Sequence, residues 1–155
     1  MTRPSIPQNL RQLVAKRADY LCEYCLIAEE DTFLGCQVDH IISVKHGGST
    51  TADNLAYACV FFNRQKGSDL GSIDWETREL VRFFNPRTDL WREHFQLDGT
   101  SIRPLTKIGQ VTERIFGFNS NSQLLERQVL ILDRRYPSEA ARRRINPLPP
   151  NELIY

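Results

Sequence analysis

Residues 38–48 read VDHIISVKHGG and place a carboxylate and an imidazole side by side, at Asp39 and His40, ahead of a Gly-Gly turn. Residues 37–44 are rich in β-branched side chains, so this stretch predicts a short strand. Neighbouring residues of a strand point to opposite faces unless the strand ends or bends there. If the strand ends at this pair, both side chains can be directed at one metal ion and one water molecule.

The chemistry of this pair suits hydrolysis. An ionised Asp is a hard oxygen ligand of the kind that Mg²⁺ takes, and Mg²⁺ keeps several waters besides one or two protein oxygens. Imidazole, with an unperturbed pKa of about 6.5, is the side chain best suited to take a proton from water near neutral pH. Taken alone, such a pair is more often a hydrogen-bonded couple on a surface, so its interpretation depends on the residues downstream.

The downstream segment continues the pattern. Residues 53–67 read DNLAYACVFFNRQKG. The apolar run Leu55–Cys59 predicts a buried strand, and residues 60–66 predict a short helix that ends at Gly67. Between the two predicted strands, residues 46–54 (HGGSTTADN) are dense in turn-forming and capping residues. A strand, a loop, a second strand and a short helix are therefore expected in that order.

Together these segments resemble the HNH nuclease family. The resemblance covers about residues 22–67, under a third of the chain. It rests on the DH pair, the Gly-Gly, the Asn-Leu and the Asn-x-x-Lys-Gly motif, which follow in family order and near family spacing. It implies a ββα-metal finger, in which two antiparallel strands and a helix hold one divalent ion against the scissile phosphate. The later stretches GSID, LVRFFNPRTDLW and HFQLDG resemble the extension of a bacterial HNH subgroup, to which we attach no chemistry.

The resemblance also implies roles for individual residues. Asp39 would be a metal ligand and His40 the general base, while Asn54 would hold the loop that orients His40. Asn63 occupies the family's final His position and would be the second metal ligand. Because Asp39 and Asn63 both offer oxygen, the site favours Mg²⁺ or Mn²⁺ over zinc.

Four cysteines raise the question of a second metal. Cys22 and Cys25 form a Cys-x-x-Cys knuckle, which in a chain without a secretion signal is typical of a metal site or a redox pair. Many HNH domains pair two such knuckles to hold a structural zinc, but here Cys59 is followed by Phe62 at the fourth position. Structural zinc nearly always takes four protein ligands. Three arrangements stay open: an apolar plug without zinc, Cys36 as the fourth ligand, or three thiolates and water. We expect the zinc site to be weakened or lost.

For the whole chain we expect a single compact α+β unit in two parts. Residues 9–70 form the nuclease core, entered through an N-terminal helix, and residues 71–155 form an extension of a β-hairpin, helices and a basic, Pro-rich tail. Residues 94–97 are β-like, the hairpin turns at Asp98-Gly99, and Thr106 caps a helix. A longer helix is expected to run from Asn119 or Ser120 to Arg135, and its predicted apolar stripe consists of Leu124, Leu125, Gln128, Ile131 and Leu132.

The net charge of the chain limits how it can bind nucleic acid. With 20 Lys and Arg against 19 Asp and Glu, the net charge of +1 excludes a histone-like polymer binder, so a nucleic-acid surface must come from local clustering. Lys45, Arg64 and Lys66 are the candidates for contacts to backbone phosphates. The runs 134–135 and 142–144 are either a second basic patch or a solvated face.

The expected function is an HNH-type endonuclease of bacterial or phage type that hydrolyses DNA phosphodiester bonds with one divalent ion and a His general base. DNA is the expected partner, and RNA is not excluded. The alternatives are a catalytically silent nucleic-acid-binding module that retained the fold, and a domain that engages another protein. No apolar run approaches the ~20 residues of a membrane span and the start has no signal-peptide core, so the cytoplasm is the expected location.

Overall fold

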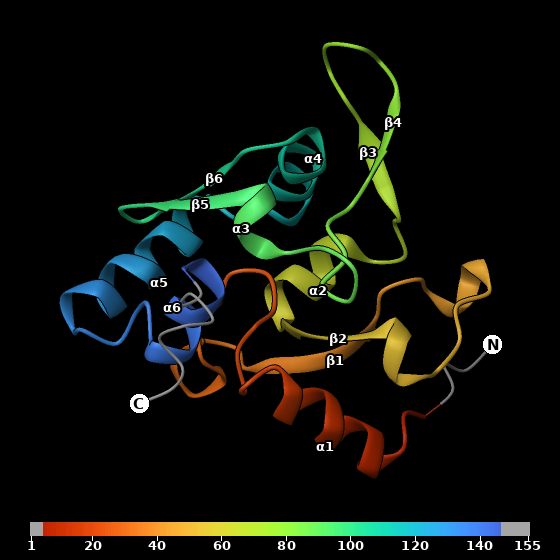
Figure 1. The fold of residues 1–155 in the computed structure, drawn as a ribbon, viewed down its shortest axis with the longest axis horizontal. Helices are drawn as coiled ribbons and strands as arrows, with labels where there is room; N and C mark the ends of the chain where they lie inside the picture. Colours follow the sequence, from red (N-terminus) through yellow and green to blue (C-terminus); the bar gives the residue numbers. More distant parts are fainter. Residues whose placement is uncertain (1–4, 147–155) are drawn as a thin grey trace, which may run out of the picture.

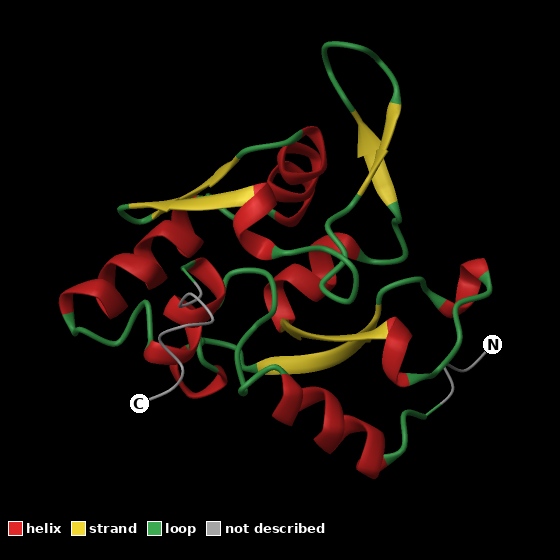
Figure 2. Cartoon of the chain, viewed as in Figure 1, coloured by secondary structure: helices red, strands yellow, loops and turns green. Residues whose placement is uncertain are grey.

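The structure, a computed structural model, describes residues 5–146, and the Pro-rich end expected at residues 147–155 lies outside them. Helices and short antiparallel strands are mixed along the described chain, which confirms the predicted α+β class, and Figure 2 shows the strands as three separate pairs. No helix among residues 5–146 is both long and apolar enough to cross a membrane. The elements are α1 (Gln8–Arg17), β1 (Cys36–His40), β2 (Leu55–Cys59), α2 (Val60–Lys66), β3 (Gly71–Ile73), β4 (Leu80–Arg82), α3 (Trp91–His94), β5 (Phe95–Asp98), β6 (Ser101–Pro104), α4 (Lys107–Phe116), α5 (Asn121–Leu132) and α6 (Glu139–Ile145).

Strands β1 and β2 form an antiparallel hairpin, and α2 follows β2 without a connecting loop (Figure 1). The register pairs His40, the last residue of β1, with Leu55, the first residue of β2. Because strand side chains alternate between faces, Leu55 and Tyr57 pack in a small cluster with α1, whereas Ala56 and Ala58 join the main core. Burial on both faces explains why β2 is a continuous apolar run.

The main core draws on both halves of the chain. It extends from Leu21 near the knuckle to Ala141 in α6. Phe62 of α2 lies against Phe118, with ring centroids 4.9 Å apart, and Phe118 lies 5.3 Å from Phe95 of β5. The extension therefore packs directly on the helix that follows β2.

Helix α5 differs from the sequence-based prediction. It ends at Leu132 rather than Arg135, and its side chains Leu125 and Leu132 are exposed. The buried face instead consists of Gln123, Glu126, Arg127 and Leu130, spaced as one side of a helix. The predicted stripe was wrong because buried acceptors of the backbone require polar partners: Arg127 donates to the carbonyl oxygens of Thr100 and Phe118, both at 2.6 Å.

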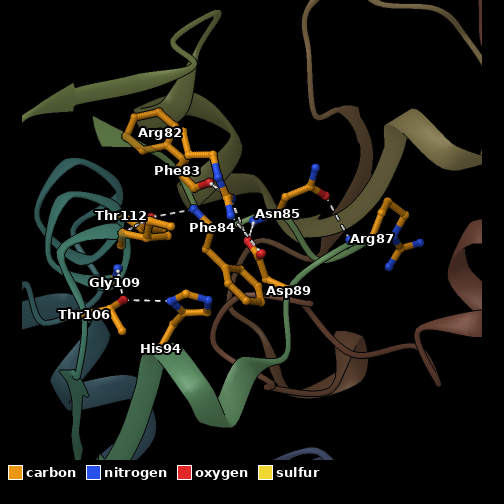
Figure 3. Close-up of polar contacts among 11 residues, drawn as sticks. Arg82, Phe83, Phe84, Asn85, Arg87, Asp89, His94, Thr106, Gly109 and Thr112 are labelled. Atoms are coloured by element: carbon orange, nitrogen blue, oxygen red, sulfur yellow. Dashed lines mark hydrogen bonds and ion pairs between the residues drawn. The ribbon is translucent and has the colours of Figure 1, made fainter. Parts of the chain in front are cut away.

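A polar network holds the segment between β4 and α4 (Figure 3). Arg82 and Asp89 form a bidentate ion pair with distances of 2.7 and 2.9 Å. His94 ends the one-turn helix α3 instead of starting a strand, and its Nδ1 lies 2.7 Å from Oγ1 of Thr106. The same hydroxyl accepts from the amide nitrogen of Gly109, which confirms the predicted cap of α4.

Candidate active site

Strand β1 ends at His40, the point at which an Asp-His pair can serve a common site. His40 is 7% exposed, and its Nε2 lies 2.8 Å from Oγ1 of Thr50 in the loop before β2. Asp39 precedes it, and one of its carboxylate oxygens lies 3.4 Å from Nζ of Lys66 on α2. Residues from β1, the β1–β2 loop and α2 therefore meet at the end of the hairpin.

Asn63 of α2 faces the Asp39 carboxylate. When its amide nitrogen is directed at Asp39, it donates to both carboxylate oxygens at 3.0 Å. When its carbonyl oxygen takes that place, the amide nitrogen donates to Oε1 of Gln37 at 2.9 Å, and the carbonyl faces the carboxylate at 3.0 Å. The first orientation is favoured in the ion-free protein, because it gives the carboxylate a donor, whereas the second brings two oxygens together and needs a cation between them.

This oxygen pair fits a hard divalent cation. Mg²⁺ sits about 2.1 Å from each oxygen in octahedral geometry, so neighbouring ligands lie about 3.0 Å apart. The Asn63 amide lies 3.0 Å from each Asp39 oxygen, so a turn of that amide would place its carbonyl oxygen at the ligand spacing. Asp39 and Asn63 are thus the described residues that would hold such an ion, with water in the remaining positions.

Lys66 differs from its expected role as a surface contact to phosphate. It is 3% exposed, and besides pairing with Asp39 its ammonium donates to the backbone carbonyl of His40 at 3.0 Å. A buried ammonium needs such partners because burial of an unpaired charge is costly. Lys66 therefore joins α2 to the end of β1 from inside the protein.

Asn54 ties together the loop that follows His40. Its Oδ1 accepts from the backbone nitrogen of Ile42 at 2.9 Å, and its Nδ2 donates to the carbonyls of Ile42 and Ser49 at 2.9 and 2.8 Å. Gly48 lies so close to this bridge that a Cβ would meet the Ile42 carbonyl oxygen at 1.7 Å, and Gly47 has a φ of +84°. The loop therefore needs both glycines of the HGG sequence, one for space and one for backbone conformation.

The remaining candidates for nucleic-acid contact are exposed. Lys45 lies in a short 3₁₀ helix, Val44–His46, of the β1–β2 loop, and Arg64 lies on α2 one residue after Asn63.

The cysteines form a separate cluster. Sulfur atoms of Cys22, Cys25 and Cys59 are buried and lie within 4.8 Å of one another, with Cys25 and Cys59 at 3.6 Å. Burial acts to raise the pKa of Cys22, but hydrogen bonds from Cys25 and Cys59 outweigh it and lower the pKa well below its usual value. In the described part of the chain this group has three members. Cys36 faces Cys59 across the hairpin but lies outside the group.

Phe62 stands at the sequence position where the HNH resemblance places a fourth cysteine. It is 0% exposed, and its ring contacts those of Phe61, Phe116 and Phe118. The donor set can hold a metal ion with three thiolates but is one ligand short of a closed structural zinc site.

Comparison with known families agrees with this geometry. Residues 22–69 match the family described as HNH endonuclease, which confirms the resemblance seen in the sequence. The matched segment runs from the knuckle through the hairpin to just beyond α2, so this part of the chain is similar to the HNH endonuclease family. Members of this family are usually metal-dependent nucleases that act on nucleic acids. Neither the curated proteins nor the solved structures give a match.

Two contacts at the site were not foreseen from the sequence. Thr50, the partner of His40, lies in the run Ser-Thr-Thr at residues 49–51, and nothing in the sequence indicates which of these hydroxyls contacts the histidine. Gln37, the partner of Asn63, offers a weak signal: it is two residues before Asp39, so it shares a strand face with the proposed ligand.

Proposed function

We propose that the protein is a cytoplasmic endonuclease that hydrolyses phosphodiester bonds of DNA, with His40 as the general base and Asp39 and Asn63 as ligands of one Mg²⁺ or Mn²⁺ ion. The observation that carries the proposal is the position of the Asn63 amide group, 3.0 Å from both carboxylate oxygens of Asp39 and beside the end of the strand that bears His40.

His40 takes the proton from the attacking water. In the tautomer that donates Nε2–H to Oγ1 of Thr50, Nδ1 is the nitrogen that takes the proton. A positioned base of this kind contributes on the order of 10²–10⁴-fold to the rate. Thr50 is a positioning residue, because it acts through the orientation and tautomer of the imidazole.

The surrounding residues hold this geometry. Asn54 fixes the loop after His40, and Lys66 binds both the Asp39 carboxylate and the His40 carbonyl. A divalent cation held by Asp39 and Asn63 would supply Lewis-acid stabilisation of the phosphate and of the leaving oxygen. Lys45 and Arg64 orient the strand through its phosphates without reading its sequence.

The test is cleavage of supercoiled plasmid in Mg²⁺ or Mn²⁺. We expect the protein to nick the plasmid, and expect His40→Ala or EDTA to abolish nicking. His46→Ala is the matched control, because His46 lies in the same loop and is exposed. Nicking that survives His40→Ala while the control behaves identically would contradict the assignment of the base.

The second candidate is a nucleic-acid-binding module without cleavage. It is favoured by the buried Phe62 at the position of a zinc ligand, because a protein that has lost one family feature can also have lost catalytic activity. Binding of plasmid without metal, together with no nicking by folded protein, would support this alternative and contradict the endonuclease.

A further inference from the structure

A hollow of about 600 Å³ lies away from the Asp39–Asn63 pair, beyond the outer edge of β2. That edge is covered by Arg17, which donates to the carbonyl of Leu55 at 2.6 Å, and by Glu23, whose carboxylate accepts from the Tyr57 nitrogen at 2.9 Å. The lining comes from α1, the knuckle, the loop before α3, α3 itself and α6. Its cationic side chains, which we call the arginine pocket, are Arg17, Arg87, Arg92, Arg143 and Arg144.

Both carboxylates that line this hollow already form ion pairs with arginines. Glu23 and Asp89 are the acidic side chains among its lining residues. Glu23 pairs with Arg87, and Asp89 is held by Arg82, which lies outside the lining. An excess of positive charge therefore remains on the other arginines.

Two of these arginines have no ion-pair partner or only a weak one, so their guanidinium groups are available to bind an anion. Within residues 5–146, Arg92 makes no hydrogen bond or ion pair, and Arg143 reaches only the exposed Glu139 at 3.7 Å. Arg144 is anchored on Asp19 at 2.7 Å. Exposed pairs such as that of Arg143 contribute little, so this side chain can change partner easily.

Arg17, which lines the hollow, has a nitrogen without a hydrogen-bond partner. Its Nε is buried and has no hydrogen-bond partner. Burial, and next the positive charge of Arg87, lower the pKa of Arg17. A bound anion would offset both effects, because it would supply negative charge and acceptor oxygens to guanidinium groups.

We propose that the arginine pocket binds backbone phosphates of DNA, as a contact separate from the Asp39–Asn63 pair. The proposal rests on the proposed function for the identity of the polymer. Phosphate oxygens suit the forked geometry of arginine, and an open hollow with charged walls admits a strand as well as a single anion. Arg17 connects the pocket to the β1–β2 hairpin, because it donates to the carbonyl of Leu55, the register partner of His40. One strand contacted at both places would be held in orientation for cleavage.

The test measures binding of a double-stranded DNA oligonucleotide in EDTA, by fluorescence anisotropy over a range of salt concentrations. Each phosphate contact contributes about 0.9 to the slope of log K against log salt. We expect R92E/R143E to reduce the slope by about 2 and to weaken binding at least about tenfold. R92K/R143K should retain most of the slope. The control R78E/R103E makes the same change in net charge on exposed arginines outside the pocket.

Equal slopes and equal affinities for R92E/R143E and R78E/R103E would overturn the arginine pocket, whatever the plasmid assay shows. The pocket variants could lower the salt slope while the protein fails to nick plasmid. That result would support the arginine pocket and contradict the endonuclease. Inorganic phosphate is the second probe. If phosphate alone binds the pocket as tightly as the oligonucleotide does, a small-anion site replaces the proposed strand contact.

Discussion

Asn54 is a single side chain that joins both ends of the loop after His40. Its amide makes three hydrogen bonds to the backbone of Ile42 and Ser49, and it is 8% exposed. The geometry of the loop after His40 therefore depends on this amide.

We expect Asn54→Ala to reduce the nicking rate about 100-fold, because the loop loses the bridge that positions His40. Loss of the buried hydrogen bonds should also lower the free energy of unfolding by about 2–4 kcal/mol. The rate is measured on supercoiled plasmid, and stability by urea unfolding. Asn9→Ala in α1 is the control for loss of an exposed amide. A variant with unchanged nicking would contradict the role of Asn54.

At the scale of elements, the cysteine cluster joins the knuckle to the end of β2. Cys22 and Cys25 supply two thiols from the loop after α1, and Cys59 is the last residue of β2. The three thiols and the buried Phe62 ring occupy the volume that a four-cysteine site would use. The contribution of a metal ion to this connection can be tested by zinc analysis.

We expect the purified protein to hold well under one zinc per chain, because a closed tetrahedral site needs a fourth ligand. Phe62→Cys should raise the zinc content to about one per chain, although removal of the buried ring costs about 3–5 kcal/mol in the absence of metal. Metal analysis after dialysis measures the zinc. Phe61→Cys, the adjacent position, should not bind it. One tightly held zinc in the unchanged protein would contradict the prediction.

The β3–β4 hairpin is tied to the body of the protein by Asp74. Its carboxylate pairs with Lys107 of α4 and accepts from the Glu76 nitrogen at 3.1 Å and from the Thr77 hydroxyl at 2.9 Å. The hydrogen bond from Lys107, followed by that from Glu76, lowers the pKa of Asp74 from 3.8 to about 2. Because the unfolded chain binds more protons between these values, the stability that Asp74 contributes is present above pH 3.8 and is lost as pH falls towards 2.

We expect Asp74→Asn to lower the melting temperature at pH 5, with a difference from the unchanged protein that shrinks as pH falls towards about 2. Thermal unfolding followed by circular dichroism over this pH range measures the effect. Asp69→Asn, at an exposed position in the preceding loop, should show no such trend. A constant difference at every pH would mean that the ionised carboxylate of Asp74 is not what stabilises the hairpin.

At the scale of the whole molecule, the segment that matches the HNH family and the residues after it share one core. The proposed division at residue 70 would separate Phe62 from Phe116 and Phe118, which cover it, and Tyr24 from Trp91, whose indole nitrogen donates to the Tyr24 carbonyl at 2.7 Å. Residues 9–70 are therefore expected to depend on residues 71–146 for their stability.

We expect a chain that ends at residue 70 to show no cooperative thermal transition, because several buried rings would be exposed to water. A chain that ends at residue 146 retains every described element and should unfold cooperatively. Calorimetry and circular dichroism compare the two. A cooperative transition in the shorter chain would establish residues 9–70 as an independent domain.

The sequence determined the local order of the site: a strand, a glycine-rich loop, a buried strand and a helix over residues 60–66. The predicted first strand, residues 37–44, was too long, and the structure ends it at His40. These features follow from short-range causes, namely side-chain alternation, backbone conformation at glycine and helix termination at Gly67. The proposed ligands Asp39 and Asn63 came together because α2 follows β2 directly, so strand register and helix phase suffice to bring them close.

Tertiary structure alone decided which polar side chains are buried. Lys66 reads as a surface cation and Arg127 as part of a solvated helix face, yet both are enclosed because the carbonyls of His40, Thr100 and Phe118 need donors. The arginine pocket likewise collects side chains from α1, α3 and α6, which are distant in sequence. Such placements depend on long-range packing and on the acceptors that other segments leave unsatisfied, and neither is encoded in local periodicity.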